Sequence, residues 1–298
     1  MTPWDPTNNK TYQILKHAED NGYGVLAPIA YNIEHIMGFI RAAEAKQSPL
    51  IIQVFPWAIT FSSGLLVIAA AHAARHASVP IAIHLDHAQD EALIRQAADT
   101  LPFDSIMVDM SHFEMEENLA KTKELVQYCH ERGIATEAEP GRIQGGEDGI
   151  ASTEDLEGAL TTEEQVGDFI ATGIDFLAPA FGNVHGEYGP RGPDLQFDSF
   201  AYADVKRRLK MIQEKAAGKV RIVLHGTNDF PEAIMKRCIA GGVSKVNVNK
   251  LVLDDYIRHL KTNAPKISLT TLMEDGVKEV QRLMEWQMDV CQSTGKAV

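Results

Sequence analysis

The chain is poor in cysteine and has no long uninterrupted apolar runs. Its 298 residues include only 3 cysteines, Cys129, Cys238 and Cys291, too few and too scattered for a disulfide framework or a CxxC metal site. We therefore expect a reducing compartment, most simply the cytoplasm. The opening residues MTPWDPTNNK lack the basic and apolar segments of a signal peptide. No apolar stretch approaches the roughly 18 residues that a membrane span needs.

Positive charge is also scarce. Lys and Arg number 28 against 41 Asp and Glu, which gives a net charge of −13. This balance argues against nucleic acid or an anionic membrane surface as a partner. A small anionic substrate remains compatible with it, because local groups and a metal ion can outweigh the net charge. The content of 45% hydrophobic and 23% charged residues is typical of a globular protein with a large core.

What the chain does have is a regular alternation of short β-rich runs and longer helical patterns. The eight candidate strands are residues 24–31, 49–55, 80–87, 105–111, 134–140, 174–181, 220–226 and 243–249. Several are almost continuously apolar, as strands covered on both faces are. Eight strand–helix units without a break in composition predict a single-domain (β/α)8 TIM barrel over residues 1–298, with a C-terminal helical tail. A doubly wound open sheet is disfavoured because no GxGxxG motif follows the first strand.

Polar residues gather where these strands end, which is the catalytic face of such a barrel. In strand order they are Asp86 and His87, then Asp109, then Glu137 and Glu139, then His185, then His225. Three imidazoles that converge from different strand ends form a typical catalytic zinc site with one open position. Glu139 is a candidate fourth ligand, and Asp109 is placed to orient a ligand imidazole.

Each of these residues also has an ordinary structural interpretation. A strand-end carboxylate such as Asp86 commonly caps the next helix, and a lone histidine is more often a hydrogen-bonded structural group than a ligand. We expect His84, inside the third strand, to be a core or supporting group. The histidines placed on helical or loop surfaces, without a role, are His17, His35, His72, His76, His130 and His259. Only the joint placement of the strand-end residues favours a metal site.

Motifs along nearly the whole chain resemble the class II, zinc-dependent fructose- and tagatose-bisphosphate aldolases. They are, in order, GYGVLAPIAYNIEH, IHLDHAQD, SIMVDMSHFEMEEN, EAEPGRIQGGEDG, FGNVHGEYGPRG, VLHG and KVNVN. The resemblance implies one zinc ion per chain held by His87, His185 and His225, with Glu139 as an additional ligand. It also implies a small-molecule ketose substrate and a homodimer or homotetramer. For the tail helix, Met284, Trp286 and Met288 offer apolar positions that would suit either an interface or packing on the barrel.

The same resemblance assigns the proton transfers. Asp86 would be the acid and base at the substrate hydroxyl, and Glu147, on a glycine-rich loop, would move the proton on the carbon next to the ketone. Retro-aldol cleavage needs a base on the hydroxyl and an electron sink at the carbonyl, which zinc would supply. The residues expected to contact substrate are Asn32, Gly186, Gly226, Asn247, Asn249 and Lys250.

The phosphate-binding segments depart from the family pattern. Phe55 follows the second strand where members usually carry Ser, and Asp229 lies in a loop that is usually small and rich in Gly and Ser. Asn249 and Lys250 replace the usual Asp-Thr or Ala-Thr, and Gly189 stands where a Lys is often found, with Arg191 two residues on. We expect a class II aldolase with an altered phosphate subsite, acting on a ketose bisphosphate or a related ketol.

Three alternatives stay open at this point. One is a related zinc lyase for a non-phosphorylated or carboxylated substrate. Another is a non-aldolase metal-dependent barrel enzyme, such as a hydrolase or isomerase. Those barrels usually place His-x-His on the first strand, where this chain has PIAYN. The third is a non-catalytic barrel, against which the complete set of metal and acid–base residues counts.

Overall fold

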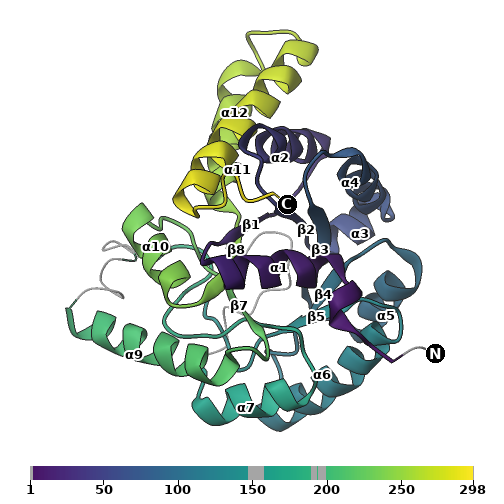
Figure 1. The fold of residues 1–298 in the computed structure, drawn as a ribbon. Helices are drawn as coiled ribbons and strands as arrows, with labels where there is room; N and C mark the ends of the chain where they lie inside the picture. Colours follow the sequence, from purple (N-terminus) through teal and green to yellow (C-terminus); the bar gives the residue numbers. More distant parts are fainter. Residues whose placement is uncertain (1–2, 147–157, 189–192, 194–198, 298) are drawn as a thin grey trace.

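Eight parallel strands form one closed barrel (Figure 1). The computed structural model describes residues 3–146, 158–188, 193 and 199–297. The strands are β1 (Val25–Pro28), β2 (Leu50–Val54), β3 (Ile81–Ala88), β4 (Ser105–Val108), β5 (Ala135–Ala138), β6 (Phe176–Leu177), β7 (Arg221–Leu224) and β8 (Val243–Val248). Their order in the sheet is β1-β8-β7-β6-β5-β4-β3-β2. The seam closes where Ile29, just after β1, forms a parallel bridge with Gln53 of β2. The predicted barrel is confirmed.

The helices surround the strands. They are η1 (Pro6–Asn8), α1 (Lys10–Asn21), α2 (Ile33–Lys46), α3 (Pro56–Ser62), α4 (Leu65–His76), α5 (Glu91–Thr100), α6 (Met115–His130), α7 (Glu163–Ala171), α9 (Ser199–Ala216), α10 (Glu232–Ala240), α11 (Lys250–Asn263) and α12 (Leu269–Val290). No described helix is by itself long and apolar enough to cross a membrane. Only α3 and α4 together, bent by 108° at their junction, pass that test on length and composition.

The strands are shorter than their apolar runs predict. For example, the run 174–181 contains only two ladder residues, Phe176 and Leu177. Ala178, Ala180 and Phe181 remain buried after the chain has left the ladder. Apolar composition reports burial rather than strand pairing, so it extends past the last ladder hydrogen bond into the loops that carry the site.

Local signals fix the ends of α2 and explain one wrong expectation. Asn32 caps the helix, since its Oδ1 accepts a hydrogen bond from the His35 backbone N–H at 2.9 Å. His35 is only 1% exposed, contrary to its expected place on the surface. Its ring lies 4.5 Å from the Tyr256 ring and 5.7 Å from that of Phe39, measured between centroids. The surface expectation failed because helical periodicity does not show which helix face a neighbouring helix covers.

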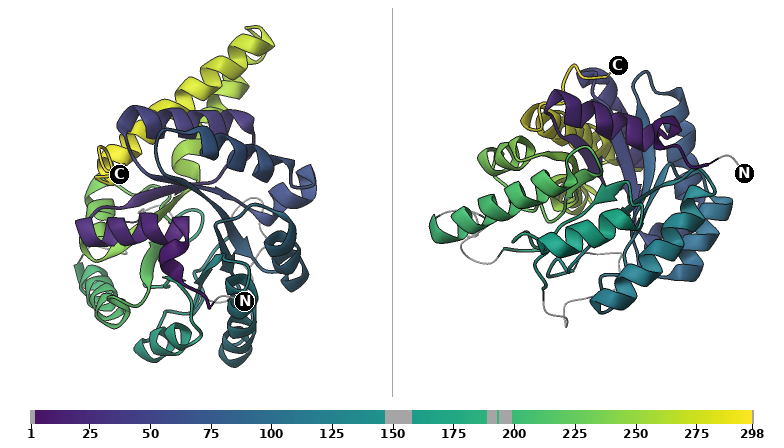
Figure 2. Two further views of the ribbon diagram at one scale, coloured as in Figure 1. Left: turned by 45° about the vertical axis from the view of Figure 1, so that its right-hand side comes forward. Right: turned by 60° about the horizontal axis from the view of Figure 1, so that its bottom comes forward.

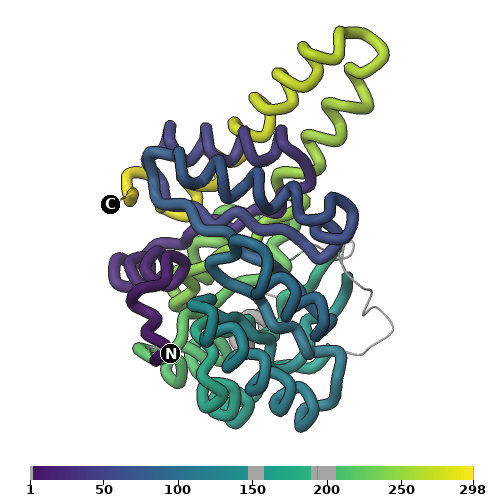
Figure 3. Tube along the Cα trace, turned by 90° about the vertical axis from the view of Figure 1, so that its right-hand side faces the viewer, coloured from purple at the N-terminus to yellow at the C-terminus, as the bar shows by residue number. Residues whose placement is uncertain are grey.

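The C-terminal tail is a pair of helices that projects beyond the barrel (Figures 2 and 3). At its base α12 packs along α2, where Gly38 permits close approach: a Cβ at Gly38 would lie 2.6 Å from Val280 Cγ1. Met284 and Met288 are fully buried in this packing, whereas Trp286 is 52% exposed. Two of the three apolar tail positions therefore serve packing within the chain.

Helix α1 covers the amino-terminal end of the barrel, which is opposite the carboxyl ends of the strands (Figure 1). Just before that helix the Trp4 ring stacks on His130 with centroids 4.3 Å apart, and its Nε1–H donates to Asp175 at 3.3 Å. Arg221 on β7 is 1% exposed and pairs with Glu19 of α1 at 3.1 Å. These contacts close one end of the barrel and leave the carboxyl ends of the strands as the accessible face.

Candidate metal centre

A bulge in β3 brings two neighbouring residues to the same cavity. In a regular strand, Asp86 and His87 would face opposite sides of the sheet. The pairing of β3 with β4 changes register between Leu85 and Ala88, and His87 has a φ of 48°, in the left-handed region. Such a conformation costs an L-residue on the order of 1–3 kcal/mol and is typical of functional sites. Because of the bulge, both side chains line the central cavity.

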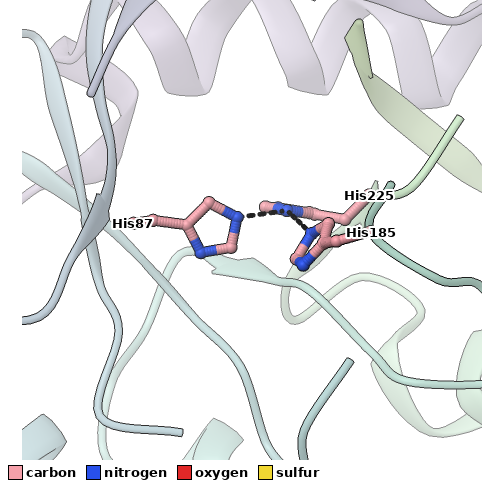
Figure 4. A group of neighbouring side chains, drawn as sticks. All are labelled: His87, His185 and His225. Atoms are coloured by element: carbon pink, nitrogen blue, oxygen red, sulfur yellow. Dashed lines mark hydrogen bonds between the residues drawn. The ribbon is translucent and has the colours of Figure 1, made fainter. Parts of the chain in front are cut away.

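Three histidine side chains meet above the barrel (Figure 4). His87 comes from β3, His185 from the loop after β6, and His225 from the end of β7. His225 Nδ1 lies 3.1 Å from His87 Nε2 and 3.4 Å from His185 Nε2. All three residues are at most 5% exposed. Ring nitrogens that converge in this way, within 4.8 Å of one another, form a ligand set suited to a metal ion.

Two carboxylates fix the orientation of these rings. His87 Nδ1–H donates to Asp109 Oδ2 at 2.8 Å, and Asp109 Oδ1 in turn accepts from the Ser111 hydroxyl at 2.6 Å. His225 Nε2–H donates to Glu137 Oε1 at 2.8 Å. Each carboxylate therefore holds a ring proton on the nitrogen that points away from the other histidines. When both rings are neutral, the lone pairs of His87 Nε2 and His225 Nδ1 face the gap between the rings, as metal binding requires.

The electrostatics of the cluster favour a single positive charge at its centre. Burial lowers the pKa of His225 to about 3 and lowers that of His185 well below its usual value. Burial also opposes charge on His87, but Asp86 and Asp109 outweigh it and raise the pKa of this imidazole to about 10. Burial works against the Asp109 carboxylate, yet His87 and Ser111 hold its pKa well below the usual range. Two neutral imidazoles beside anionic carboxylates fit a metal cation.

Glu139 lies behind this cluster. Its Oε1 accepts the Ile143 backbone N–H at 2.6 Å, whereas its buried Oε2 has no hydrogen-bond partner among the described residues. Burial raises the pKa of this carboxyl well above its usual value. One Glu139 oxygen lies within 4.8 Å of ligand atoms of His87 and Asp109. These three residues form a candidate ligand set separate from that of His87, His185 and His225. The structure thus places Glu139 next to one ligand, on the side of Asp109.

Two side-chain amides orient Asp86. The Gln53 amide donates to Asp86 Oδ2 at 3.3 Å, and the Asn247 amide donates to the same oxygen at 3.1 Å. Asp86 is 2% exposed and lines a cavity with an empty volume of ≈270 Å³. The cavity is lined by Ile29, Phe55, Asp86, His87, His185, His225, Gly226, Thr227, Asn228, Asn247, Val248 and Asn249.

The other residues predicted to contact substrate divide into two groups. Gly226, Asn247 and Asn249 line the cavity. Lys250 begins α11 and lies 3.9 Å from Glu187 Oε1, Gly186 accepts the Asn228 amide at 3.0 Å, and Asn32 caps α2; none of these three is among the lining residues. Glu147, like Gly189 and Arg191, lies outside the described residues.

Sequence reasoning missed two residues inside strands. Gln53 of β2 and Lys245 of β8 are both fully buried, and Lys245 Nζ donates to Glu137 Oε2 at 2.7 Å. The available signal was a long polar side chain within an otherwise apolar strand, in LIIQV and VSKVNV. In a barrel such residues point to the interior when their neighbours face the helices.

Comparison with known proteins gives one consistent answer. The sequence model of the family described as fructose-bisphosphate aldolase class-II matches residues 9–296. A Coccidioides immitis protein named "Putative fructose-bisphosphate aldolase" is 50% identical over 297 residues, which cover 97% of this chain and 95% of the relative. The fructose-bisphosphate aldolase of Streptococcus pneumoniae serotype 4 is 35% identical over 302 residues, with 96% and 98% covered.

Comparison with solved structures gives the same family as the sequence comparison. A crystal structure of a Coccidioides immitis protein with an equivalent name superposes with a TM-score of 0.92 at 51% identity, covering 97% of this chain and 98% of the other. The YdjI aldolase of Escherichia coli K12 superposes with a TM-score of 0.79 at 26% identity, covering 96% of this chain and 98% of the other. Both likenesses extend over the barrel and its tail.

Replacing the carboxylate behind His87 should weaken metal binding. In Asp109→Asn the amide no longer holds the His87 proton on Nδ1, so we expect the dissociation constant for zinc to rise about 10–100-fold. Competition with a chromophoric chelator measures it. The control Asp90→Asn changes an exposed N-cap of α5 and should leave the constant unchanged. An Asp109→Asn protein that binds zinc as tightly as the wild type would contradict this reading of the cluster.

Proposed function

The chain belongs to the class-II fructose-bisphosphate aldolase family, whose members are metal-dependent aldehyde-lyases, and from this premise we propose how its cavity cleaves a ketose or related ketol. The observation that carries the proposal is the convergence of three buried imidazoles and one oriented carboxylate, Asp86, on a single cavity. Neither group alone suffices, because a reversible retro-aldol reaction needs an electron sink and a proton acceptor together.

We assign the metal to His87, His185 and His225, one ion per chain, with zinc as the ion. Three imidazoles with an open position are the donor set that catalytic zinc prefers. When bound, the ion supplies a Lewis acid that stabilises negative charge at the substrate carbonyl oxygen. Glu139, whose buried Oε2 lies beside His87 without a partner in the described part of the chain, is the added ligand in this assignment.

Asp86 is the acid and base in the proposal. It accepts the proton of the hydroxyl on the carbon whose bond to its neighbour breaks, and it returns that proton in the reverse direction. The amides of Gln53 and Asn247 hold the carboxylate in one orientation, so no reorganisation is needed when the proton arrives. The carbon left electron-rich next to the carbonyl must then take up a proton, a role that rests with Glu147 on the strength of the family motif alone.

The substrate end of the cavity has one apolar wall. Phe55 is 2% exposed at the N-cap of α3, and its ring centroid lies 6.2 Å from that of His87. Ile29 and Val248 continue this wall. A phosphate against these three side chains would lose hydration, and the side chains themselves offer it no donor. We therefore propose that the phosphate subsite is altered and that the preferred substrate places no anionic group against this wall: a non-phosphorylated ketol, or a carboxylated ketol whose carboxylate lies elsewhere in the cavity.

Metal removal and loss of the base should each abolish turnover. Asp86→Asn should lower kcat by about 100-fold or more while retaining one metal per chain, because Asp86 is the proton acceptor and not a ligand. Coupled detection of the aldehyde product, with and without chelator, and elemental analysis measure these quantities. If zinc-loaded wild-type protein gave no chelator-sensitive product from any ketose or ketol tested, the proposed function would be wrong.

The wall at Phe55 should decide between substrates. We expect wild-type protein to cleave non-phosphorylated or carboxylated ketols with a higher kcat/KM than fructose or tagatose bisphosphate. Phe55→Ser should lower the ratio of kcat/KM for the ketol to kcat/KM for the bisphosphate about tenfold, because the smaller side chain admits a phosphate. The matched control, Phe113→Ser, changes a partly buried ring outside the cavity lining and should leave the ratio unchanged. Efficient fructose bisphosphate cleavage by the wild type would contradict the altered subsite.

We further propose that the chain forms a homodimer or homotetramer. Support comes from apolar side chains left exposed on α2, α3 and α4 around one pocket: Ile33 (47%), Phe61 (74%) and Leu65 (68%). Exposed apolar side chains gathered on one side of a protein often mark an interface. Light scattering should give a mass above the 32.8 kDa of one chain, and Phe61→Lys/Leu65→Lys should lower it. Leu160→Lys, at an exposed leucine of another segment, should not.

A cytoplasmic location completes the proposal. All three cysteines are buried and unpaired, which suits a reducing compartment. Burial raises the pKa of each thiol to about 12, so none is poised to react in the folded protein.

A further inference from the structure

A buried ion pair lies next to the three histidines and takes no part in the proton transfers described above. Lys245 on β8 donates to Glu137 Oε2 on β5 at 2.7 Å, and both side chains are fully buried. Taking two such charges out of water costs several kcal/mol per ion, and well-packed apolar residues often stabilise a core equally well. Stability of the barrel therefore does not account for this pair.

The second oxygen of Glu137 connects the pair to the metal centre. Glu137 Oε1 accepts the Nε2–H of His225 at 2.8 Å, and the Nδ1 of the same ring faces His87 and His185. The three residues thus form a chain of ammonium, carboxylate and imidazole. It parallels the chain of hydroxyl, carboxylate and imidazole formed by Ser111, Asp109 and His87. In each chain an outer group occupies one carboxylate oxygen and leaves the other for the ring.

The surroundings of Glu137 give Lys245 a specific task. His84 Nε2 lies 3.6 Å from Glu137 Oε2 and has no hydrogen-bond partner among the described residues. Burial lowers the pKa of His84 well below its usual value, so this ring is neutral. Lys245 is therefore the cation next to Oε2. By occupying that oxygen, it determines which oxygen remains for His225.

We propose that Lys245 is a positioning residue for the metal centre: by fixing one oxygen of Glu137, it holds the other oxygen on His225 Nε2–H and so keeps the Nδ1 lone pair of that ring aimed at the metal position. The inference rests on the proposed metal site. It adds that a residue two contacts away from the ligand His225 fixes the orientation of that ligand's hydrogen-bond partner. Without the ammonium, the Glu137 carboxylate is no longer fixed against His225 Nε2–H, and an amide at position 137 is free to present either its oxygen or its NH2 group to the ring.

The sharpest test uses an amide at position 137. In Glu137→Gln, Lys245 attracts the amide oxygen, so the NH2 group is turned toward His225 Nε2 and favours the wrong tautomer. We expect zinc affinity to fall about 10–100-fold, the range for loss of an outer-shell partner. In Lys245→Met/Glu137→Gln the amide can turn its oxygen to His225. Adding the second substitution should therefore recover most of the lost affinity.

Removing an unpaired buried lysine also relieves a charge penalty, so recovery alone is not sufficient, and nitrogen-15 NMR of Glu137→Gln must in addition show the His225 ring protonated at Nδ1. If the double variant bound zinc no more tightly than Glu137→Gln, Lys245 would not set the orientation and the inference would fail. The matched control is Arg221→Met/Glu19→Gln, which removes the ion pair at the other end of the barrel and should leave zinc affinity at the wild-type value. Urea unfolding of each variant separates loss of affinity from loss of fold.

A measurement on the wild type removes any dependence on variants that fold poorly. Nitrogen-15 NMR of the metal-free protein should show the His225 ring protonated at Nε2, and Nδ1 protonation would overturn the inference. The failure of the proposed metal site itself looks different. In that case wild-type protein and His225→Ala would bind zinc equally weakly, whatever the tautomer.

Discussion

The site depends on a constraint at two consecutive positions: a proton acceptor and a metal-binding imidazole must enter one cavity from one strand. A regular strand sends neighbours to opposite faces, so β3 must bulge, and His87 adopts a left-handed backbone conformation to do so. The bulge brings Asp86 within reach of amides on β2 and β8 and brings His87 to the carboxylate that follows β4. The ends of three other strands are thereby tied to two adjacent residues of β3, and the strain is offset by the hydrogen bonds that it makes available.

Charge compensation explains how so many polar side chains can be buried around the metal centre. Asp86, Asp109, Glu137 and Glu139 are all at most 2% exposed around the three imidazoles, and Lys245 is the fully buried cation among them. Carboxylates in such number need a compensating positive charge. Part of it comes from Lys245 and part from amide and hydroxyl donors, while the centre of the histidine cluster is where one more positive charge is favoured. The carboxylates thus serve two ends: they orient the ligands, and they create the potential that retains a cation.

The barrel and the set of strand-end residues were predictable, but the connections between them were not. Runs of apolar residues predicted eight strands, and a carboxylate and three histidines at the ends of those strands predicted a common cavity. The bulge at His87 has no signature in IHLDHAQD, because backbone φ is set by pairing with β4. Gln53 and Lys245 lie inside apolar runs, where a one-dimensional pattern does not show that alternate residues meet across a barrel. Asn32 was assigned to substrate by resemblance, whereas its side chain caps α2, a local use that N-cap residues commonly have.

The seam of the barrel carries one more consequence. The sheet begins at β1 and ends at β2, and the edges meet through a single bridge at Gln53, whose side chain also reaches back to the Ala27 carbonyl and across to Asp86. One residue thus joins the first and second strands of the chain and orients the base. An incompletely closed barrel with every metal ligand in place would still lack an aligned proton acceptor. The site therefore becomes able to catalyse the reaction only when the barrel closes. A form of the protein that is incompletely folded or opened at this seam is inactive, and it does not catalyse an incorrect reaction.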